Sequence, residues 1–298
     1  MYLAFACAFG CMFACAATVV GRATVKNSPK AGKSRFSLAT LAAEDFPDSE
    51  GADYIDEISL PQSALKSLLD ETSFAMASQD VRYYLNGLLL EREKDILRTV
   101  ATDGHRLALG SLTTDSTVAE KNNIIVPRKA ILELSRLLDD TDDNVTISFS
   151  NQQIKVELTD LHFTSKLIDG QFPNYERVLP LGGDKEVIAN REQLKQALSR
   201  ASILSNDKHR SVRINLESNL FKATVTNQEQ ESAEEEITVE YAGPSLEIAF
   251  NNAYLLDLLN AIPDEKVKLT FSDENSSVLI TPANEDHERQ YVVMPMRL

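Results

Sequence analysis

The sequence RFSLATLAAEDFP at residues 35–47 returns as HFTSKLIDGQFP at residues 162–173, with one residue fewer between its two phenylalanines. A looser third copy, YVVMP, stands at residues 291–295 near the end of the chain. The prolines that close the three copies are almost evenly spaced. Even spacing of similar segments is the signature of repeated structural units. We therefore expect three units of nearly equal size, with most of the first one absent from this chain.

The two complete units show the same order of predicted elements, with helices marked by apolar residues at i, i+3 and i+4 and strands by short apolar or alternating runs. In the first unit we expect helices from about residues 61 and 127 and strands at 81–90, 97–102, 106–112, 145–149 and 154–158. In the second we expect helices at 191–204 and 254–262 and strands at 212–216, 221–226, 237–241, 267–271, 278–281 and 291–294. This pattern predicts an α+β fold, in which each unit is an antiparallel sheet with two helices packed on one face.

The composition limits the classes of function. The formal net charge is −15. Because phosphate binding depends on Lys and Arg, this charge argues against a protein that grips DNA and reads its sequence. A protein that encircles DNA without gripping it needs only a modestly positive inner face, and an acidic exterior is compatible with that arrangement.

The N-terminal segment differs in composition from the rest of the chain. Residues 1–43 carry five cations and no anion, and residues 1–21 carry no charge. The segment is open to three interpretations: a targeting segment, although it lacks a basic start; a membrane anchor just long enough to span a bilayer; or the product of a displaced start codon or a damaged gene, which we favour. All three cysteines lie in the first 15 residues, which excludes a disulfide framework from the two units and fits a cytoplasmic location.

Four motifs follow one another along the chain: QDVRYYLNG at residues 79–87, ATDGHRLA at 101–108, FPNYERVLP at 172–180 and VVMPMRL at 292–298. Together they resemble the bacterial DNA sliding clamps, the β subunits of DNA polymerase III, over about residues 33–298. The resemblance implies the DNA-clamp fold of repeated domains. It divides the chain into an atypical apolar and basic N-terminal segment (1–32), a remnant of a first clamp domain with its linker (33–52), a middle clamp domain (53–180) and a C-terminal clamp domain (181–298).

By this resemblance, a cleft between the last two domains binds short peptides from the polymerase catalytic subunit, the clamp loader and other partners. The residues that match the family's cleft are Leu85, Thr102, Gly104, His105, Arg106, Leu107, Pro173, Arg177, Val178, Asn251, Tyr254, Ser277, Val292, Val293, Met294, Pro295, Met296, Arg297 and Leu298. Its apolar floor would bury a leucine or phenylalanine of the partner at about 25 cal/mol per Å², and methionine suits a site that accepts several peptides. The arginines would hold carbonyl or carboxylate groups at the rim, although core packing explains each residue taken singly. His209 and Asn275 stand where the family commonly has apolar residues, so we expect one wall to be more polar.

The same resemblance implies a DNA-facing surface, because the family lines its central hole with helices. The candidates lie on the four predicted helices and on the loop at residues 79–84: Lys66, Gln79, Arg82, Tyr83, Tyr84, Arg128, Lys129, Arg136, Arg191, Lys195 and Arg200. Arginine beside tyrosine suits sugars and bases. Contacts to phosphate and sugar give no sequence preference. A solvated helix face explains the helix cations equally well.

The resemblance implies a processivity factor that tethers the polymerase to duplex DNA, without catalysis, metal or cofactor. Family members are homodimers of three-domain chains. Because most of the first domain is absent from this chain, we expect the chain to be mainly monomeric. A truncated clamp that binds partner peptides without encircling DNA therefore remains open. An alternative of another class is a metal-dependent hydrolase that uses Asp103 and His105. Alone, the TDGH sequence at residues 102–105 is more simply a hairpin turn.

Overall fold

The computed structural model describes residues 30–31, 33–35, 53–118, 121–180, 182–204, 210–284 and 288–297. The chain divides into two units, Met1–Ala52 and Asp53–Leu298. In the first unit the described residues form a hairpin of β1 (Lys30–Ala31) and β2 (Ser34–Arg35). Our interpretations of the N-terminal segment and of the first-domain remnant otherwise fall outside the described residues.

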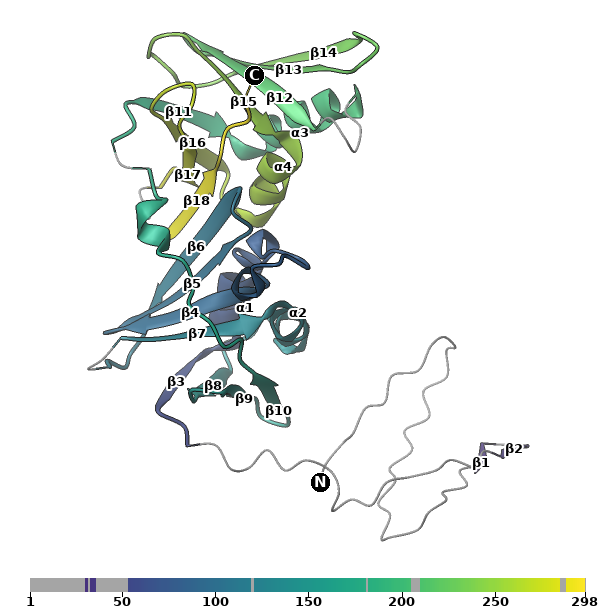
Figure 1. Cartoon of the computed structure of the whole chain (residues 1–298), viewed down its shortest axis with the longest axis vertical. Coiled ribbons are helices and arrows are strands. Elements are labelled where there is room, and N and C mark those ends of the chain that lie inside the picture. The colour runs from purple at the N-terminus through teal and green to yellow at the C-terminus, as the bar shows by residue number, and fades with distance from the viewer. Residues whose placement is uncertain are drawn as a thin grey trace. The chain divides into compact units, whose positions relative to one another are not determined.

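The larger unit contains the same order of elements twice. The middle repeat contains β3 (Asp56–Pro61), α1 (Gln62–Asp70), β4 (Gly87–Glu93), β5 (Ile96–Thr102), β6 (Arg106–Thr113), β7 (Asn122–Pro127), α2 (Arg128–Leu137), β8 (Asn144–Phe149), β9 (Gln153–Glu157) and β10 (His162–Lys166). The last repeat contains β11 (Lys185–Asn190), α3 (Arg191–Ala201), β12 (Ser211–Glu217), β13 (Leu220–Thr226), β14 (Ser232–Thr238), β15 (Leu246–Asn251), α4 (Asn252–Ala261), β16 (Lys266–Phe271), β17 (Val278–Pro282) and β18 (Arg289–Val293). Element by element the two repeats correspond (Figure 1). The predicted α+β fold of repeated antiparallel sheets with two helices each is confirmed.

One sheet runs through both repeats. Its strand order is β11-β16-β17-β18-β6-β5-β4-β7, and two four-stranded sheets, β10-β9-β8-β3 and β14-β13-β12-β15, flank it. The joint is the antiparallel pair β6 and β18, in which Arg106 lies opposite Val293 and Gly110 opposite Arg289. A Cβ atom on Gly110 would lie 2.9 Å from Cδ1 of Leu68 in α1. Glycine therefore permits the close approach of this helix to the joint.

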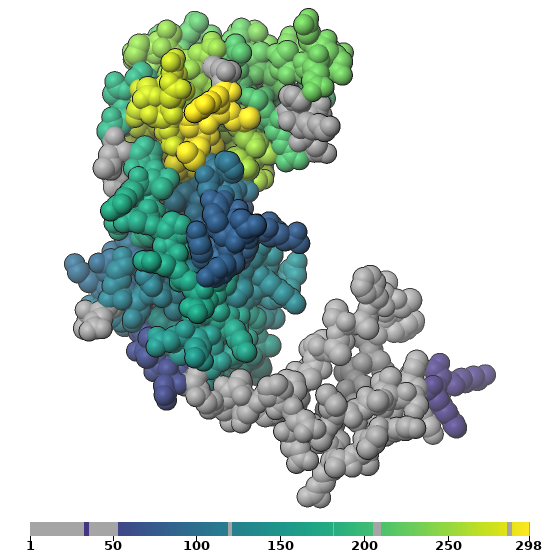
Figure 2. Space-filling view, in the orientation of Figure 1, coloured from purple at the N-terminus to yellow at the C-terminus, as the bar shows by residue number. Residues whose placement is uncertain are grey.

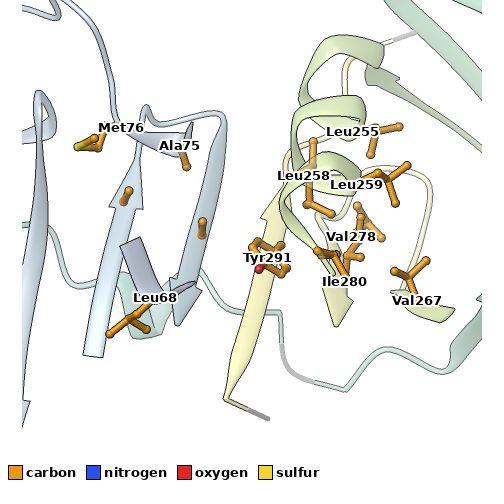
Figure 3. Packing of buried hydrophobic residues seen from close by; sticks show 14 of the residues in the cluster. Leu68, Ala75, Met76, Leu255, Leu258, Leu259, Val267, Val278, Ile280 and Tyr291 are labelled. Atoms are coloured by element: carbon orange, nitrogen blue, oxygen red, sulfur yellow. The ribbon is translucent and has the colours of Figure 1, made fainter. Parts of the chain in front are cut away.

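The helices bury their apolar sides against one face of the joined sheet (Figure 1). Helices α1 and α2 start directly after prolines, Pro61 and Pro127, whereas the side chains of Asn190 and Asn251 cap α3 and α4 by accepting backbone N–H groups. One hydrophobic cluster extends through both repeats. Figure 3 shows part of it, with Leu68 and Met76 from the middle repeat and Leu258 and Tyr291 from the last one.

Three predicted elements differ from the structure. The strand expected at residues 81–90 starts only at Gly87, after a loop that contains the 3₁₀ turn Tyr83–Leu85, and Val81 at the loop tip is 95% exposed. Local polar groups close this loop, because the Asn86 amide donates to the Asp80 carbonyl (2.8 Å) and accepts from the Asp80 N–H (2.9 Å). The helix expected at 191–204 ends at Ala201, and the strand expected at 237–241 is Ser232–Thr238.

Within the larger unit, five of the described strands were not predicted: β3, β7, β10, β11 and β15. In the part of the chain that the structure describes, no helix is long and apolar enough to span a membrane.

Candidate functional site

The turn between β5 and β6 is built by its own side chains. The Asp103 carboxylate accepts the backbone N–H groups of His105 (2.9 Å) and Arg106 (3.0 Å). The Thr102 hydroxyl donates to the Arg106 carbonyl (2.7 Å) and accepts the N–H of Gly104. Gly104 has a φ of +90°, in the left-handed region that favours glycine. The DGHR sequence thus fixes a rigid turn at the joint between the repeats.

These contacts bear on the hydrolase alternative. One oxygen of Asp103 caps the backbone of the turn and the other pairs with the Arg106 guanidinium (3.1 Å). The imidazole of His105 instead stacks on the ring of Tyr254, with centroids 6.3 Å apart. No group of three or more His, Cys, Asp or Glu residues within the described ranges could hold a metal ion. The geometry of this turn therefore does not favour acid–base or metal chemistry.

Arg106 connects the turn to the last repeat. Its guanidinium pairs with Asp257 of α4 (2.6 Å), donates to the Phe74 carbonyl (3.0 Å) and lies 4.6 Å from the ring centre of Tyr254. The resemblance predicts that Arg106 holds carbonyl or carboxylate groups of a partner at the rim. In the structure the N–H groups of the Arg106 guanidinium bind groups of the chain itself. The observed role of Arg106 is therefore to hold the two repeats together.

The C-terminal residues lie against the same turn. The N–H of Met294 donates to the His105 carbonyl (2.9 Å), and the N–H of Met296 donates to the Ala249 carbonyl (2.8 Å). Both methionines are largely accessible, 45% and 41% exposed. Val293 is buried in the main core, while Val292 is buried on the opposite face with Leu107. The sequence VVMPM thus places two flexible apolar side chains at the surface of the joint.

The segment that joins the repeats contributes a third part. Residues 167–184 connect β10 to β11, and part of this segment covers the face of the joined sheet that carries no helix (Figure 1). Leu107 and Val292 form a second buried cluster there with Tyr175, against which Phe172 and Leu179 pack. Figure 2 shows the residues of the chain end, in yellow, at the surface above this region.

The structure brings part of the predicted cleft together. Residues linked by direct contacts or by one buried cluster are His105, Arg106, Leu107, Tyr254, Val292, Val293 and Met294. Pro173, Arg177 and Val178 flank Tyr175 in exposed positions, whereas Leu85 is buried. The Asn251 side chain caps α4, accepting the N–H of Ala253 (3.0 Å). Ser277 is half-buried just before β17, Pro295 is half-buried, Arg297 is exposed, and Leu298 and His209 lie outside the described residues.

The predicted DNA-facing residues meet partly in one hollow. A hollow of about 410 Å³ lies between the loop that carries Gln79 and helix α2. Its lining residues are Ala77, Ser78, Gln79, Asn86, Arg128, Lys129, Leu132, Glu133 and Arg136. Arg128 also donates to the Met76 carbonyl (3.0 Å), and Arg136 pairs with Glu133 (3.1 Å). Three cations of α2 thus line one concave surface together with Gln79 of the loop, which is far from them in the sequence.

Other predicted DNA contacts are already engaged within the chain. Lys66 donates to the carbonyls of Ser135 and Leu138 at the end of α2, and Arg191 donates to the carbonyls of Leu259 and Asp264. Arg200 pairs with Glu235 (2.7 Å).

Arg82 forms a two-pronged pair with Asp80 and donates to the Asp103 carbonyl. The hydrogen bonds from Arg82 lower the pKa of the Asp80 carboxyl to about 2. Within the described ranges, Lys129 and Lys195 form no ion pair.

Four residues that hold the joint and the joining segment were not predicted as site residues: Asp257, Phe74, Glu91 and Tyr175. Asp257 and Phe74 hold Arg106, and Glu91 holds the hydroxyl of Tyr175 (2.8 Å). Tyr175 lies within the FPNYERVLP motif, so its position in the motif was an available signal. Nothing in the local sequence of Asp257 or Glu91 marks them, because their partners are distant along the chain.

Comparison with known proteins identifies the family. Residues 59–174 match the family model for the DNA polymerase III beta subunit, central domain, and residues 176–297 match the model for its C-terminal domain. The beta sliding clamp of Pseudomonas aeruginosa is 54% identical over 269 residues, which is 90% of this chain and 73% of the relative. That of Escherichia coli is 48% identical over the same shares.

Solved structures agree with this assignment. The sliding clamp of Pseudomonas aeruginosa bound to griselimycin superposes with a TM-score of 0.87 at 53% identity, covering 92% of this chain and 74% of that one. The sliding clamp of Bartonella birtlesii, also bound to griselimycin, gives 0.85 at 39% identity over the same shares. The chain therefore belongs to the family of DNA polymerase III beta subunits, the beta sliding clamps.

Proposed function

We propose that this chain is a processivity factor that tethers DNA polymerase III and other replication proteins to duplex DNA and performs no chemistry itself. The observation that carries the proposal is the joint between the repeats. There the turn at residues 102–106, the C-terminal VVMPM sequence and the Tyr175 segment come from three clamp motifs and meet around β6 and β18. Core packing can explain each residue singly, but it does not explain why three distant motifs meet at one surface. A shared binding surface does.

The peptide-binding part of this function rests on apolar contact. Met294 and Met296 at the chain end and Val178 in the joining segment are all exposed apolar side chains. Burying a leucine or phenylalanine of a partner there would contribute about 1.5–3 kcal/mol. Methionine adapts to differently shaped partners because it is unbranched and polarizable. Since two solved relatives bind griselimycin, we propose that this chain binds it as well.

The DNA-facing part rests on the hollow beside α2. Its lining includes three cations and one carboxylate, Glu133, on a chain whose net charge is −15. Local positive charge can attract phosphate although the whole protein is acidic. Side chains of this kind contact phosphate and sugar, so we expect weak binding with no sequence preference.

Two measurements test the proposal. Calorimetry should detect binding of griselimycin and of a synthetic peptide from the polymerase III catalytic subunit that contains adjacent leucine and phenylalanine. Loading onto a nicked circular DNA, gel filtration in moderate salt and linearisation should then show whether the chain encircles DNA. Absence of any ligand binding by the folded protein would contradict the proposed peptide site.

A second candidate function, peptide binding without encircling DNA, is favoured by the sheet edges. Because the repeats correspond, β14 of the last repeat matches β6, and β10 of the middle repeat matches β18. The matching pair β6 and β18 forms the joint, whereas β14 and β10 are terminal strands of their sheets within the described part of the chain. We propose that the chain is mainly monomeric and leaves these edges open. Retention on the DNA circle with release on cutting would contradict this and would mean that the edges find partners.

A further inference from the structure

The segment that joins the two repeats has little backbone structure of its own. Between β10 and β11 it contains one 3₁₀ turn, Tyr175–Arg177. Its described backbone hydrogen bonds to the rest of the molecule are those of Leu167 and Ile168, at the start of the segment, and Val178 bonds only within the turn, to Tyr175. Irregular surface segments with few backbone bonds open readily unless side chains hold them. The position of the later half of this segment therefore depends on its side chains.

Tyr175 is the side chain that reaches deepest from this turn. It is 6% exposed, and its ring packs in the cluster of Leu89, Val100, Leu107 and Val292. These residues come from β4, β5, β6 and β18, so the ring touches a cluster supplied by both repeats. An aromatic ring buried in this way contributes a large apolar area at fixed geometry.

The hydroxyl of Tyr175 joins a charged network around the buried carboxylate of Glu91. It donates to Oε1 of Glu91 (2.8 Å) and accepts from Arg98 (3.1 Å), while Arg98 and Lys121 pair with the two oxygens of Glu91 (2.7 and 2.9 Å). Glu91 is 3% exposed. Burial acts to raise the pKa of the Glu91 carboxyl, but the hydrogen bonds from Lys121 and Tyr175 outweigh it and the net shift is downward. A buried carboxylate with both oxygens bound in this way holds its donors in fixed positions.

The residues on either side of Tyr175 are exposed by contrast. Pro173 and Arg177 are exposed, and Val178 is 44% exposed although it is apolar. They belong to the proposed peptide site, together with Leu107 and Val292, which lie in the same cluster as the Tyr175 ring. We infer that Tyr175 is a positioning residue: its anchored hydroxyl fixes Pro173 and Val178 beside the joint and so preorganises one wall of the peptide site. This inference rests on the proposed function.

A purely structural role for Tyr175 predicts different behaviour from a positioning role. In Tyr175→Phe the ring stays buried and Glu91 keeps Arg98 and Lys121, so the fold is retained. A loosened segment must become ordered when a peptide binds, and that ordering opposes binding. We expect binding of the polymerase III peptide to weaken by about three- to tenfold, together with faster hydrogen exchange of the amides at residues 174–179.

The matched control is Tyr241→Phe. The Tyr241 hydroxyl is also bound, to the Pro244 carbonyl, and its ring is buried in the last repeat. This variant removes the same atom without touching the joining segment, so peptide affinity should stay at the wild-type value. A second variant, Glu91→Gln, removes the charged acceptor of Tyr175. If the two residues act as one unit, Tyr175→Phe in the Glu91→Gln background should change affinity by less than twofold.

The possible outcomes distinguish a failure of the inference from a failure of the proposed function. If the wild-type chain binds the peptide, and Tyr175→Phe binds it more weakly and exchanges its amides faster, the inference is supported. Wild-type binding with unchanged affinity and exchange in Tyr175→Phe overturns the inference and leaves the proposed function intact. Faster exchange with unchanged affinity also overturns it, because the anchored wall would then not matter to the peptide. Absence of peptide binding by the wild-type chain overturns both.

Discussion

The guanidinium of Arg106, in the middle repeat, lies 4.6 Å from the ring centre of Tyr254 in helix α4 of the last repeat. The same guanidinium pairs with Asp257 one helical turn further on. His105 precedes Arg106 in the turn between β5 and β6, and its imidazole stacks on the Tyr254 ring. One short turn therefore contributes both a charge and an aromatic surface to the contact between repeats.

Replacing Arg106 by alanine should destabilise the protein by about 2–4 kcal/mol, because it removes a mostly buried cation with several hydrogen bonds and two aromatic contacts. Asp257→Asn should cost less than about 1 kcal/mol, since Asp257 is itself half exposed. Arg177→Ala is a control, because Arg177 is exposed, and should change stability by about 0.5 kcal/mol or less. Urea unfolding followed by circular dichroism measures all three. Equal stabilities of Arg106→Ala and Arg177→Ala would show that the contact holds nothing together.

Deleting residues 296–298 should weaken binding of the polymerase III peptide by at least about 1–2 kcal/mol, the loss of a buried apolar anchor. Met296 is exposed on the joint but fixed there through its backbone bond to Ala249. Met296→Leu keeps an apolar side chain of similar size and should bind nearly as well as the wild type. Calorimetry compares the two variants. Unchanged affinity after the deletion would remove the chain end from the site.

Much of the fold could be predicted because leucine spacing and alternation are local signals. Leu65, Leu68 and Leu69 mark α1 in the sequence and are buried in the structure. Strand β14 was predicted too far along the chain. Acidic residues occupy three successive positions in it and hide the alternation between its two faces. The loop before Gly87 was misread because the bonds between Asp80 and Asn86 override the apolar residues that surround them.

The site was predictable as a set of motifs but not as a set of contacts. Arg106 and Asp257 are 151 residues apart along the chain, and no local pattern relates them. The same holds for Glu91 and Tyr175, which are 84 residues apart. The sequence also gives no sign that backbone carbonyls bind Lys66 and Arg191. In a linear sequence, a cation that binds carbonyls elsewhere in the chain looks the same as a cation that faces DNA.

Binding to DNA should depend most on cations that are not already paired. Replacing both Lys129 and Lys195 by alanine should flatten the slope of log affinity against log salt by about 0.9 for each phosphate that the variant no longer neutralises, with no change in sequence preference. Arg82→Ala should have a smaller effect because Asp80 offsets its charge, and Asp80→Asn should strengthen binding by releasing it. Lys94→Ala, in the exposed turn between β4 and β5, is the control. Fluorescence anisotropy over a salt series measures the slopes, and equal slopes for the double variant and Lys94→Ala would place these faces away from DNA.

Stability should depend on pH through Glu91. Its folded-state pKa is lowered: burial opposes this, but the hydrogen bonds of Lys121 and Tyr175 prevail. Below the unfolded-state pKa near 4.5 the unfolded chain binds more protons than the folded one, so the contribution of Glu91 is present above that pH and is lost as the pH falls through the folded-state value. Glu91→Gln should therefore cost about 1.5–3 kcal/mol at pH 7, and the difference from wild type should shrink as the pH falls below about 4.5.

Glu93→Gln is the matched control for this pH dependence, because Glu93 lies on the same strand, approaches Lys121 at 3.6 Å and is 45% exposed. Its stability should differ from wild type by no more than about 0.5 kcal/mol at either pH, since exposed pairs contribute little. Urea titrations of the three proteins at pH 7 and at pH 4 give the comparison. A Glu91→Gln deficit that is equally large at both pH values would mean that the Gln side chain disturbs packing around Tyr175. The ionised carboxylate would then not be what holds the network.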